Sequence, residues 1–115
     1  MISMFAIPNC DTVKKARDFL ESNKIAYKFI NFKKSPPSRV QIELWSDYAG
    51  ELPINKKGMT YRKYKEHYET LTTTQKIDFI VENTSLIKRP VLVKDDKVIA
   101  FGFSEAEYKK LFREE

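Results

Sequence analysis

The chain has 115 residues; 42% of them are hydrophobic, 13% are aromatic and only three are glycine. This composition excludes a disordered or low-complexity protein, and the length suits one domain with its own core. The formal net charge is +5, but the basic residues are spread over several segments. Nucleic-acid binding has little support, because no run reaches five or six like charges and no standard binding module is present. A basic pocket for a small anionic substrate accounts for the charge at least as well.

The sequence also gives no reason to expect a membrane or an oxidising compartment. A single cysteine cannot form an internal disulfide. The apolar N-terminal segment 1–7 lacks the basic start of a signal peptide and enters a strand-like pattern at once. Since no apolar run is long enough to span a bilayer, we expect a soluble cytoplasmic protein.

The first part of the chain predicts a strand, a helix and a second strand. Residues 2–7 form a short apolar run typical of a buried strand, which Pro8-Asn9 closes. Asp11 or Thr12 can serve the N-terminal end of the next helix, which residues 22–24 end. The apolar stripe of this helix is formed by Val13, Ala16, Phe19 and Leu20. Residues 25–32 predict the second strand, so this unit implies a parallel pair with a right-handed crossover.

A mostly helical stretch follows, from about residue 35 to 86. Ser38 and Gln41 have the spacing of a capping box, and Gly50 fits the end of the helix that they begin. Residues 51–60 predict a loop, and residues 61–68 and 74–82 predict two further helices. The apolar positions are Val40, Leu44 and Tyr48 on one face of the first helix, and Ile77, Ile80 and Val81 inward on the last. Because the stretch is too short to bury a core alone, we interpret it as an insertion.

The last part of the chain predicts a hairpin and a final helix. Residues 91–93 and 98–101 are strand-like and flank a polar turn at Asp95-Asp96. Ser104 and Glu107 have capping-box spacing before a helix that places Tyr108, Leu111 and Phe112 on one face. The order predicts an α/β protein of one domain, residues 1–115. Its thioredoxin-like mixed four-stranded sheet has a helical insertion between the βαβ and ββα halves.

Cys10 is the most informative residue, because it lies where the first strand gives way to the first helix. The N–H groups and the dipole at a helix N-terminus favour a thiolate, and Lys14 and Lys15 add positive charge one turn further on. The alternative is a small buried hydrophobic residue. The turn position suits a reactive thiol better, so we predict a nucleophile.

The neighbours of Cys10 restrict its chemistry to a single thiol. Val13 and Ile7 occupy the positions three residues after and before it, which excludes a Cys-X-X-Cys dithiol. Any redox cycle must therefore use an external thiol to resolve the intermediate. No metal site is expected, since one cysteine and one histidine do not make a ligand set. That histidine, His67, is interpreted as a surface residue.

Arg89-Pro90 and two basic positions in the insertion are the other candidates. A proline is permitted at the first residue of a buried strand, and Arg89 offers a planar fork for an oxyanion or carboxylate. Lys57 and Arg62, in or beside the loop before the second inserted helix, are similar candidates. Each of these charges can equally be a solvated surface residue.

Five segments carry a family resemblance: residues 9–16, which begin with Asn9-Cys10, and residues 55–58, 61–63, 87–90 and 102–104. In order and spacing they cover essentially the whole chain, and they resemble the arsenate reductase (ArsC)/Spx family, in particular its YffB-like branch. The resemblance implies a thioredoxin-like fold with a helical insertion. It also implies a cis Pro90 facing the cysteine and Cys10 as the redox-active thiol.

The YffB-like branch implies a glutathione-dependent thiol reductase. Glutathione would then be a co-substrate with no bound cofactor, glutathione or a glutaredoxin-like protein would be the donor, and a disulfide or small anion the substrate. The expected binding residues are Arg89, Pro90, Lys14, Lys57 and Arg62.

Two alternatives remain open. Family arsenate reductases use three arginines, of which Arg89 carries over, while the other positions fall near Asn55 and at about Gly102. Spx-type regulators bind the RNA polymerase α-subunit and mostly carry a Cys-X-X-Cys switch, which Val13 removes here.

Overall fold

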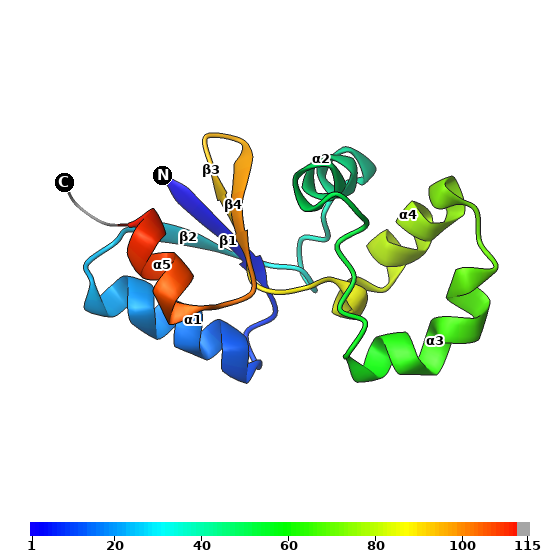
Figure 1. The fold of residues 1–115 in the computed structure, drawn as a ribbon, viewed down its shortest axis with the longest axis horizontal. Coiled ribbons are helices and arrows are strands. Elements are labelled where there is room, and N and C mark those ends of the chain that lie inside the picture. Colours follow the sequence, from blue (N-terminus) through cyan, green and yellow to red (C-terminus); the bar gives the residue numbers. More distant parts are fainter. Residues whose placement is uncertain (113–115) are drawn as a thin grey trace. The chain divides into compact units, whose positions relative to one another are not determined.

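Four strands form one mixed sheet in the order β2-β1-β3-β4 in the computed structural model, which describes residues 1–112. The strands are β1 (Ile2–Ala6), β2 (Tyr27–Asn31), β3 (Val91–Lys94) and β4 (Lys97–Phe101). β1 pairs in parallel with β2 and antiparallel with β3, and β3 and β4 form the expected hairpin. This arrangement confirms the predicted α/β, thioredoxin-like mixed sheet (Figure 1).

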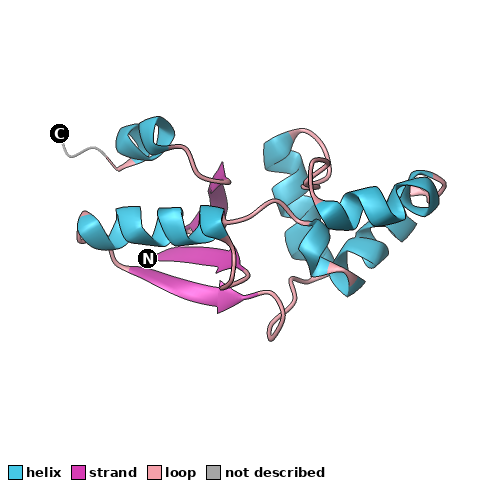
Figure 2. Cartoon of the chain, turned by 90° about the horizontal axis from the view of Figure 1, so that it is seen from below, coloured by secondary structure: helices cyan, strands magenta, loops and turns pink. Residues whose placement is uncertain are grey.

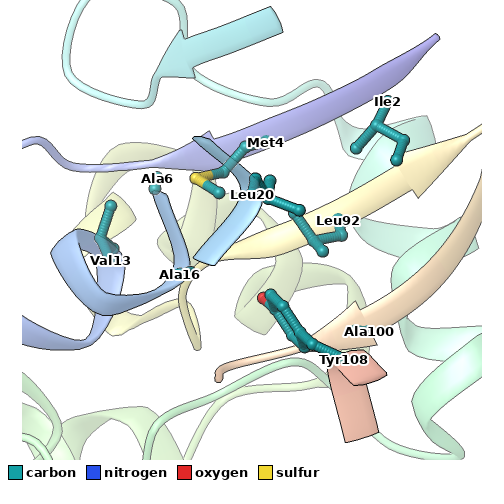
Figure 3. Packing of buried hydrophobic residues seen from close by; sticks show 9 residues of the cluster. All are labelled: Ile2, Met4, Ala6, Val13, Ala16, Leu20, Leu92, Ala100 and Tyr108. Carbon is teal, nitrogen blue, oxygen red and sulfur yellow. The ribbon is translucent and has the colours of Figure 1, made fainter. Parts of the chain in front are cut away.

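The sheet belongs to the first of two compact units, made of Met1–Asn31 and Arg89–Glu115. Its helices are α1 (Asp11–Ser22) and α5 (Glu105–Leu111). Side chains of both helices join alternate residues of β1 in one buried cluster: Ile2, Met4, Ala6, Val13, Ala16, Leu20, Leu92, Ala100 and Tyr108 (Figure 3). Both helices therefore pack on the same face of the sheet. This core holds fixed the turn from β1 into α1, where Cys10 lies.

The second unit, Phe32–Lys88, is built from helices, as Figure 2 shows. They are α2 (Arg39–Ala49), α3 (Met59–Glu69), α4 (Thr73–Glu82) and the 3₁₀ turn η1 (Thr84–Leu86). The segment that we predicted as an insertion, residues 35–86, lies within this unit. An isolated bridge joins Ile54 to Ile87, and the Asn55 N–H donates to the Leu86 carbonyl at 2.8 Å, so the loop before α3 is held against the end of the unit.

Helix ends follow the local signals closely. Ser38 caps α2 in a reciprocal capping box with Gln41, and Gly50 ends that helix with the left-handed φ of 79° that glycine adopts most readily. Ser104 accepts the Glu107 N–H at the start of α5. The N-cap of α1 is Cys10 itself, and Asp11 is the first residue inside the helix, so Thr12 does not begin it.

The buried face of α2 differs from the apolar positions that its sequence emphasises. Val40, Leu44 and Tyr48 do share one face, but they are 64%, 50% and 54% exposed. Ile42 and Trp45 are buried instead, and the Trp45 ring packs on Phe32 with centroids 6.1 Å apart. An ion pair between Arg39 and Asp78 also links α2 to α4. The helix therefore packs on the rest of the unit through Ile42 and Trp45, and not through the regularly spaced apolar row of Val40, Leu44 and Tyr48.

Within residues 1–112, no helix is both long and apolar enough to cross a membrane.

Candidate functional site

Cys10 occupies the N-cap position of α1, with the extended backbone angles φ −138° and ψ 128°. Its carbonyl accepts the first intrahelical hydrogen bond, from the Lys14 N–H at 2.9 Å. The thiol is only partly buried, so a substrate can reach the sulfur from solvent.

The surroundings of the thiol lower its pKa on balance. Burial raises the pKa of Cys10, but the backbone N–H of Val13, the guanidinium of Arg89 and the backbone N–H of Thr12 outweigh it by donating to the thiolate. The positive charge of Arg89 lowers the pKa further. Val13 and Thr12 are the third and second residues of the helix, whose amides lack intrahelical partners. A thiolate here satisfies the orphan amides that a capping oxygen satisfies elsewhere.

Arg89 and Pro90 lie immediately before β3, and the Arg89-Pro90 peptide bond is cis, as the family resemblance implies. The Pro90 carbonyl accepts the Gly102 N–H at 2.8 Å, and the Gly102 carbonyl accepts the Tyr108 hydroxyl, also at 2.8 Å. These two bonds tie the start of β3 to the end of β4 and to α5. Arg89 is therefore presented to Cys10 from a braced part of the sheet.

A groove runs from the thiol along α1. It has a volume of about 560 Å³ and is lined by Pro8, Asn9, Cys10, Asp11, Lys14, Arg17, Asp18 and Glu21. All of these residues belong to the first unit. The groove carries charges of both signs, so it differs from the purely basic pocket that net charge alone favours.

The candidate lysines contribute less to the thiol than expected. Lys14 lines the groove with Cys10, as its spacing predicts, whereas Lys15 lies in a different hollow beside α5. Neither side chain is among the groups that lower the pKa of Cys10. The cation that stabilises the thiolate is Arg89, which reaches it from 79 positions further along the chain.

Lys57 and Arg62 belong to the second unit. Lys57 is exposed in the loop before α3, where its N–H donates to the Asn55 side chain at 3.2 Å, and Arg62 is exposed on α3. Gly58 precedes α3, and a Cβ there would lie 3.0 Å from the Asn55 amide nitrogen. The part of Lys57 and Arg62 in substrate binding remains a prediction.

The described residues contain no group of three or more histidine, cysteine, aspartate or glutamate side chains that could hold a metal ion. His67 is exposed on the surface, as interpreted from the sequence, and the centre of its ring lies 5.4 Å from that of the Phe79 ring.

The sequence matches the model of the ArsC family over residues 5–111. The chain belongs to the ArsC family. A relative named "Global transcriptional regulator Spx", from Streptococcus agalactiae, is 30% identical over 95% of this chain and 81% of its own length. Membership accounts for the thioredoxin-like sheet.

Two solved structures are similar in both fold and sequence. A YffB protein is 30% identical with a TM-score of 0.83, over 96% of this chain and 97% of that chain. A possible arsenate reductase from Streptococcus mutans is 29% identical with a TM-score of 0.80, over 96% of this chain and 97% of that chain. Both extend over the two units, so the similarity includes the helical insertion.

Sequence reasoning found Cys10, Arg89 and Lys14 but missed the acidic side of the groove. The apolar stripe of α1 leaves Asp18 and Glu21 on its outer face, with no sign that they line a groove. Their spacing from Cys10 and Lys14 along one helical face is visible in the sequence and could have indicated them.

Proposed function

We propose that this ArsC-family chain is a monothiol oxidoreductase that reduces disulfides with glutathione as the external thiol. The observation that carries the proposal is the Cys10 thiol at the start of α1, with its pKa lowered by the Val13 and Thr12 amides and by Arg89. A lowered pKa gives more thiolate at neutral pH, and the thiolate is the attacking species. Because the chain has one cysteine, a second thiol must come from outside. A thiol that must stay reduced between cycles also suits the cytoplasm.

The reaction has two exchange steps. The Cys10 thiolate attacks one sulfur of a disulfide; a new sulfur–sulfur bond forms, the old one breaks, and the leaving sulfur departs as a thiolate that takes up a proton. Glutathione thiolate then attacks the mixed disulfide and restores the Cys10 thiolate. That glutathione leaves in a mixed disulfide with the other half of the substrate, and a second glutathione releases this half as a thiol and leaves as oxidised glutathione. Two glutathione molecules thus supply the two electrons, and no bound cofactor is needed.

Arg89 has two roles in this scheme. Its charge stabilises the resting thiolate and the same sulfur when glutathione displaces it. Its planar fork also has enough donors to bind a glutathione carboxylate beside the sulfur. The buried Pro90 shapes the adjoining backbone, and Lys14 provides a second cation at the mouth of the groove.

Intact-mass measurement after incubation with oxidised glutathione tests the proposal. We expect one glutathione adduct per chain and none in Cys10→Ser, with the adduct removed by reduced glutathione. A wild-type chain that forms no adduct at any pH between 6 and 9 would refute it.

The similarity to the Spx regulator supports a second candidate, a regulator that docks on RNA polymerase. A pull-down with the C-terminal domain of the polymerase α-subunit distinguishes the two, because a reductase needs no such contact. Binding that persists in Cys10→Ser, without glutathione chemistry in the wild type, favours the regulator.

Arsenate reduction is less well supported, although one of the similar structures is a possible arsenate reductase. Asn55 and Gly102 stand where the resemblance places two of the three arginines. Gly102 has φ 73°, a conformation that an arginine rarely adopts. Turnover of arsenate with glutathione and glutaredoxin would restore this candidate.

A further inference from the structure

The groove beside Cys10 contains more charge than the thiol chemistry uses. Arg17 and Glu21 form an ion pair, with the Arg17 Nε 4.0 Å from a Glu21 carboxylate oxygen. The Tyr27 hydroxyl bridges them, because it accepts from Arg17 at 3.0 Å and donates to Glu21. The Arg17 guanidinium also lies 4.2 Å from the centre of the Phe29 ring. These contacts hold Arg17 and Glu21 against β2, where they form one wall of the groove.

Three charges in the groove remain available to a ligand. Arg17 and Glu21 are occupied by the contacts above, whereas the side chains of Asp11, Lys14 and Asp18 form no hydrogen bond or ion pair within residues 1–112. Asp11 lies in the first turn of α1, where the helix dipole compensates its charge. With Arg89 at the thiol, the site then offers two cations and two anions. Such a site suits neither a simple dianion nor a simple dication, but a molecule that carries both signs.

The spacing of these charges defines the size of that molecule. At 1.5 Å per residue, Lys14 and Asp18 lie about 6 and about 12 Å along the axis from Cys10. Side chains on a helix slant towards its N-terminus, so the Asp18 carboxylate lies closer to the thiol than its Cα does. A tripeptide spans about 10 Å when extended. A carboxylate near Lys14 and an ammonium group near Asp18 are therefore within reach of one peptide-sized thiol.

We propose that the α1 groove selects zwitterionic peptide thiols, with Lys14 binding the carboxylate and Asp18 binding the ammonium group. The proposal rests on the thiol chemistry of Cys10 proposed above and adds specificity to it. It makes Asp18 a substrate-binding residue two turns from the reacting sulfur. It also predicts that a disulfide of the same size without its ammonium groups reacts more slowly.

A matched pair of disulfides tests this prediction. Oxidised glutathione and its derivative acetylated on both amino groups have the same reacting sulfurs and the same carboxylates, and differ in the ammonium charge. The rate of adduct formation at Cys10 is measured by intact mass for each, at low ionic strength. We expect the wild type to prefer the unmodified disulfide by about two- to fivefold, the range of an exposed ion pair. The preference should shrink at high salt.

Two variants assign the effect to the groove. Asp18→Asn should abolish the preference, which is measured as the ratio of the two rates within each variant. Asp96→Asn, which makes the same charge change in the exposed turn of the β3–β4 hairpin, should keep the preference. Equal rates for both disulfides in the wild type, or a preference that survives in Asp18→Asn, would overturn this proposal and leave the monothiol function standing. Failure of both disulfides to form an adduct would overturn both.

Discussion

Cys10 owes its lowered pKa to groups from two distant parts of the sequence. The Thr12 and Val13 amides come from its own helix, and any N-cap side chain would meet such amides. Arg89 comes from the residue before Pro90 and adds both a hydrogen bond and a charge. The two contributions can be separated, because a substitution at position 89 leaves the helix N-terminus intact.

Substitution of Arg89 should raise the pKa of Cys10. Arg89→Ala removes a donor and a charge that favour the thiolate, so the pH midpoint of iodoacetamide alkylation should move upward from the wild-type value. Arg89→Lys keeps the charge but not the planar fork, and its midpoint should lie between the two. Lys15→Ala is the control, since Lys15 does not contribute to the lowered pKa. An unchanged midpoint in Arg89→Ala would show that the helix alone sets the pKa.

The same shift makes stability depend on pH in a defined direction. In the unfolded chain the Cys10 pKa returns to its ordinary value of about 8.5. The folded chain loses this proton at a lower pH, so Cys10 contributes stability as pH rises through the folded pKa, and contributes fully above the unfolded pKa. Below the folded pKa the contribution is absent.

Urea unfolding of the wild type and Cys10→Ser, under reducing conditions at several pH values, measures this contribution. Serine does not titrate in this range, and the other groups cancel in the difference. We expect the free energy of unfolding of the wild type to gain on that of Cys10→Ser between about pH 6 and pH 9. A difference that is constant or falls with pH would contradict the lowered pKa.

At the scale of single elements, most boundaries could be predicted from the sequence because their causes are local. The Ser38–Gln41 box, Gly50 and the Asp95-Asp96 turn each act on a few neighbouring residues. The face that α2 buries could not be predicted in this way. The regular row of Val40, Leu44 and Tyr48 is as apolar as a core face, but burial depends on what the rest of the unit presents, here Phe32 against Trp45.

A pair of alanine substitutions on α2 tests this assignment. Ile42 has no exposed surface, whereas Leu44, two positions along, is 50% exposed. Ile42→Ala should therefore lower the free energy of unfolding by about 2–5 kcal/mol. Leu44→Ala should lower it by less than about 1 kcal/mol, because little packing is lost. Urea unfolding followed by Trp45 fluorescence measures both, and a larger loss in Leu44→Ala would place the buried face on the other side of the helix.

The capping box of α2 should contribute measurably to stability. Ser38→Ala removes the acceptor for the Gln41 N–H and should cost about 1 kcal/mol in the free energy of unfolding. Ser35→Ala is a suitable control, since Ser35 is exposed in the preceding loop and caps no helix. Equal midpoints of urea unfolding for the two variants would mean that the capping box adds nothing to the free energy of unfolding.

At the scale of the whole molecule, the candidate site divided into a predictable and an unpredictable part. Cys10 and Lys14 are one helical turn apart, so their shared groove follows from sequence spacing. The contact between Cys10 and Arg89 depends on the β1–β3 pairing, because Cys10 follows β1, Arg89 precedes β3, and the two residues are 79 positions apart in the sequence. No local pattern encodes that pairing. The family resemblance indicated it only because it places Arg89-Pro90 against the cysteine.

The groups that tune Cys10 all lie in the first unit, which has a buried core of its own. Damage to the core of the second unit should therefore lower stability without changing the thiol. Ile80 is fully buried in that unit, and Ile80→Ala should lower the free energy of unfolding by about 2–5 kcal/mol. The pH midpoint of Cys10 alkylation should stay at the wild-type value, because Thr12, Val13 and Arg89 keep their places. Leu20→Ala, an equally large deletion on the inner face of α1, is the comparison that should disturb the thiol as well. If Ile80→Ala moves the alkylation midpoint as far as Leu20→Ala does, the insertion takes part in setting the chemistry of Cys10.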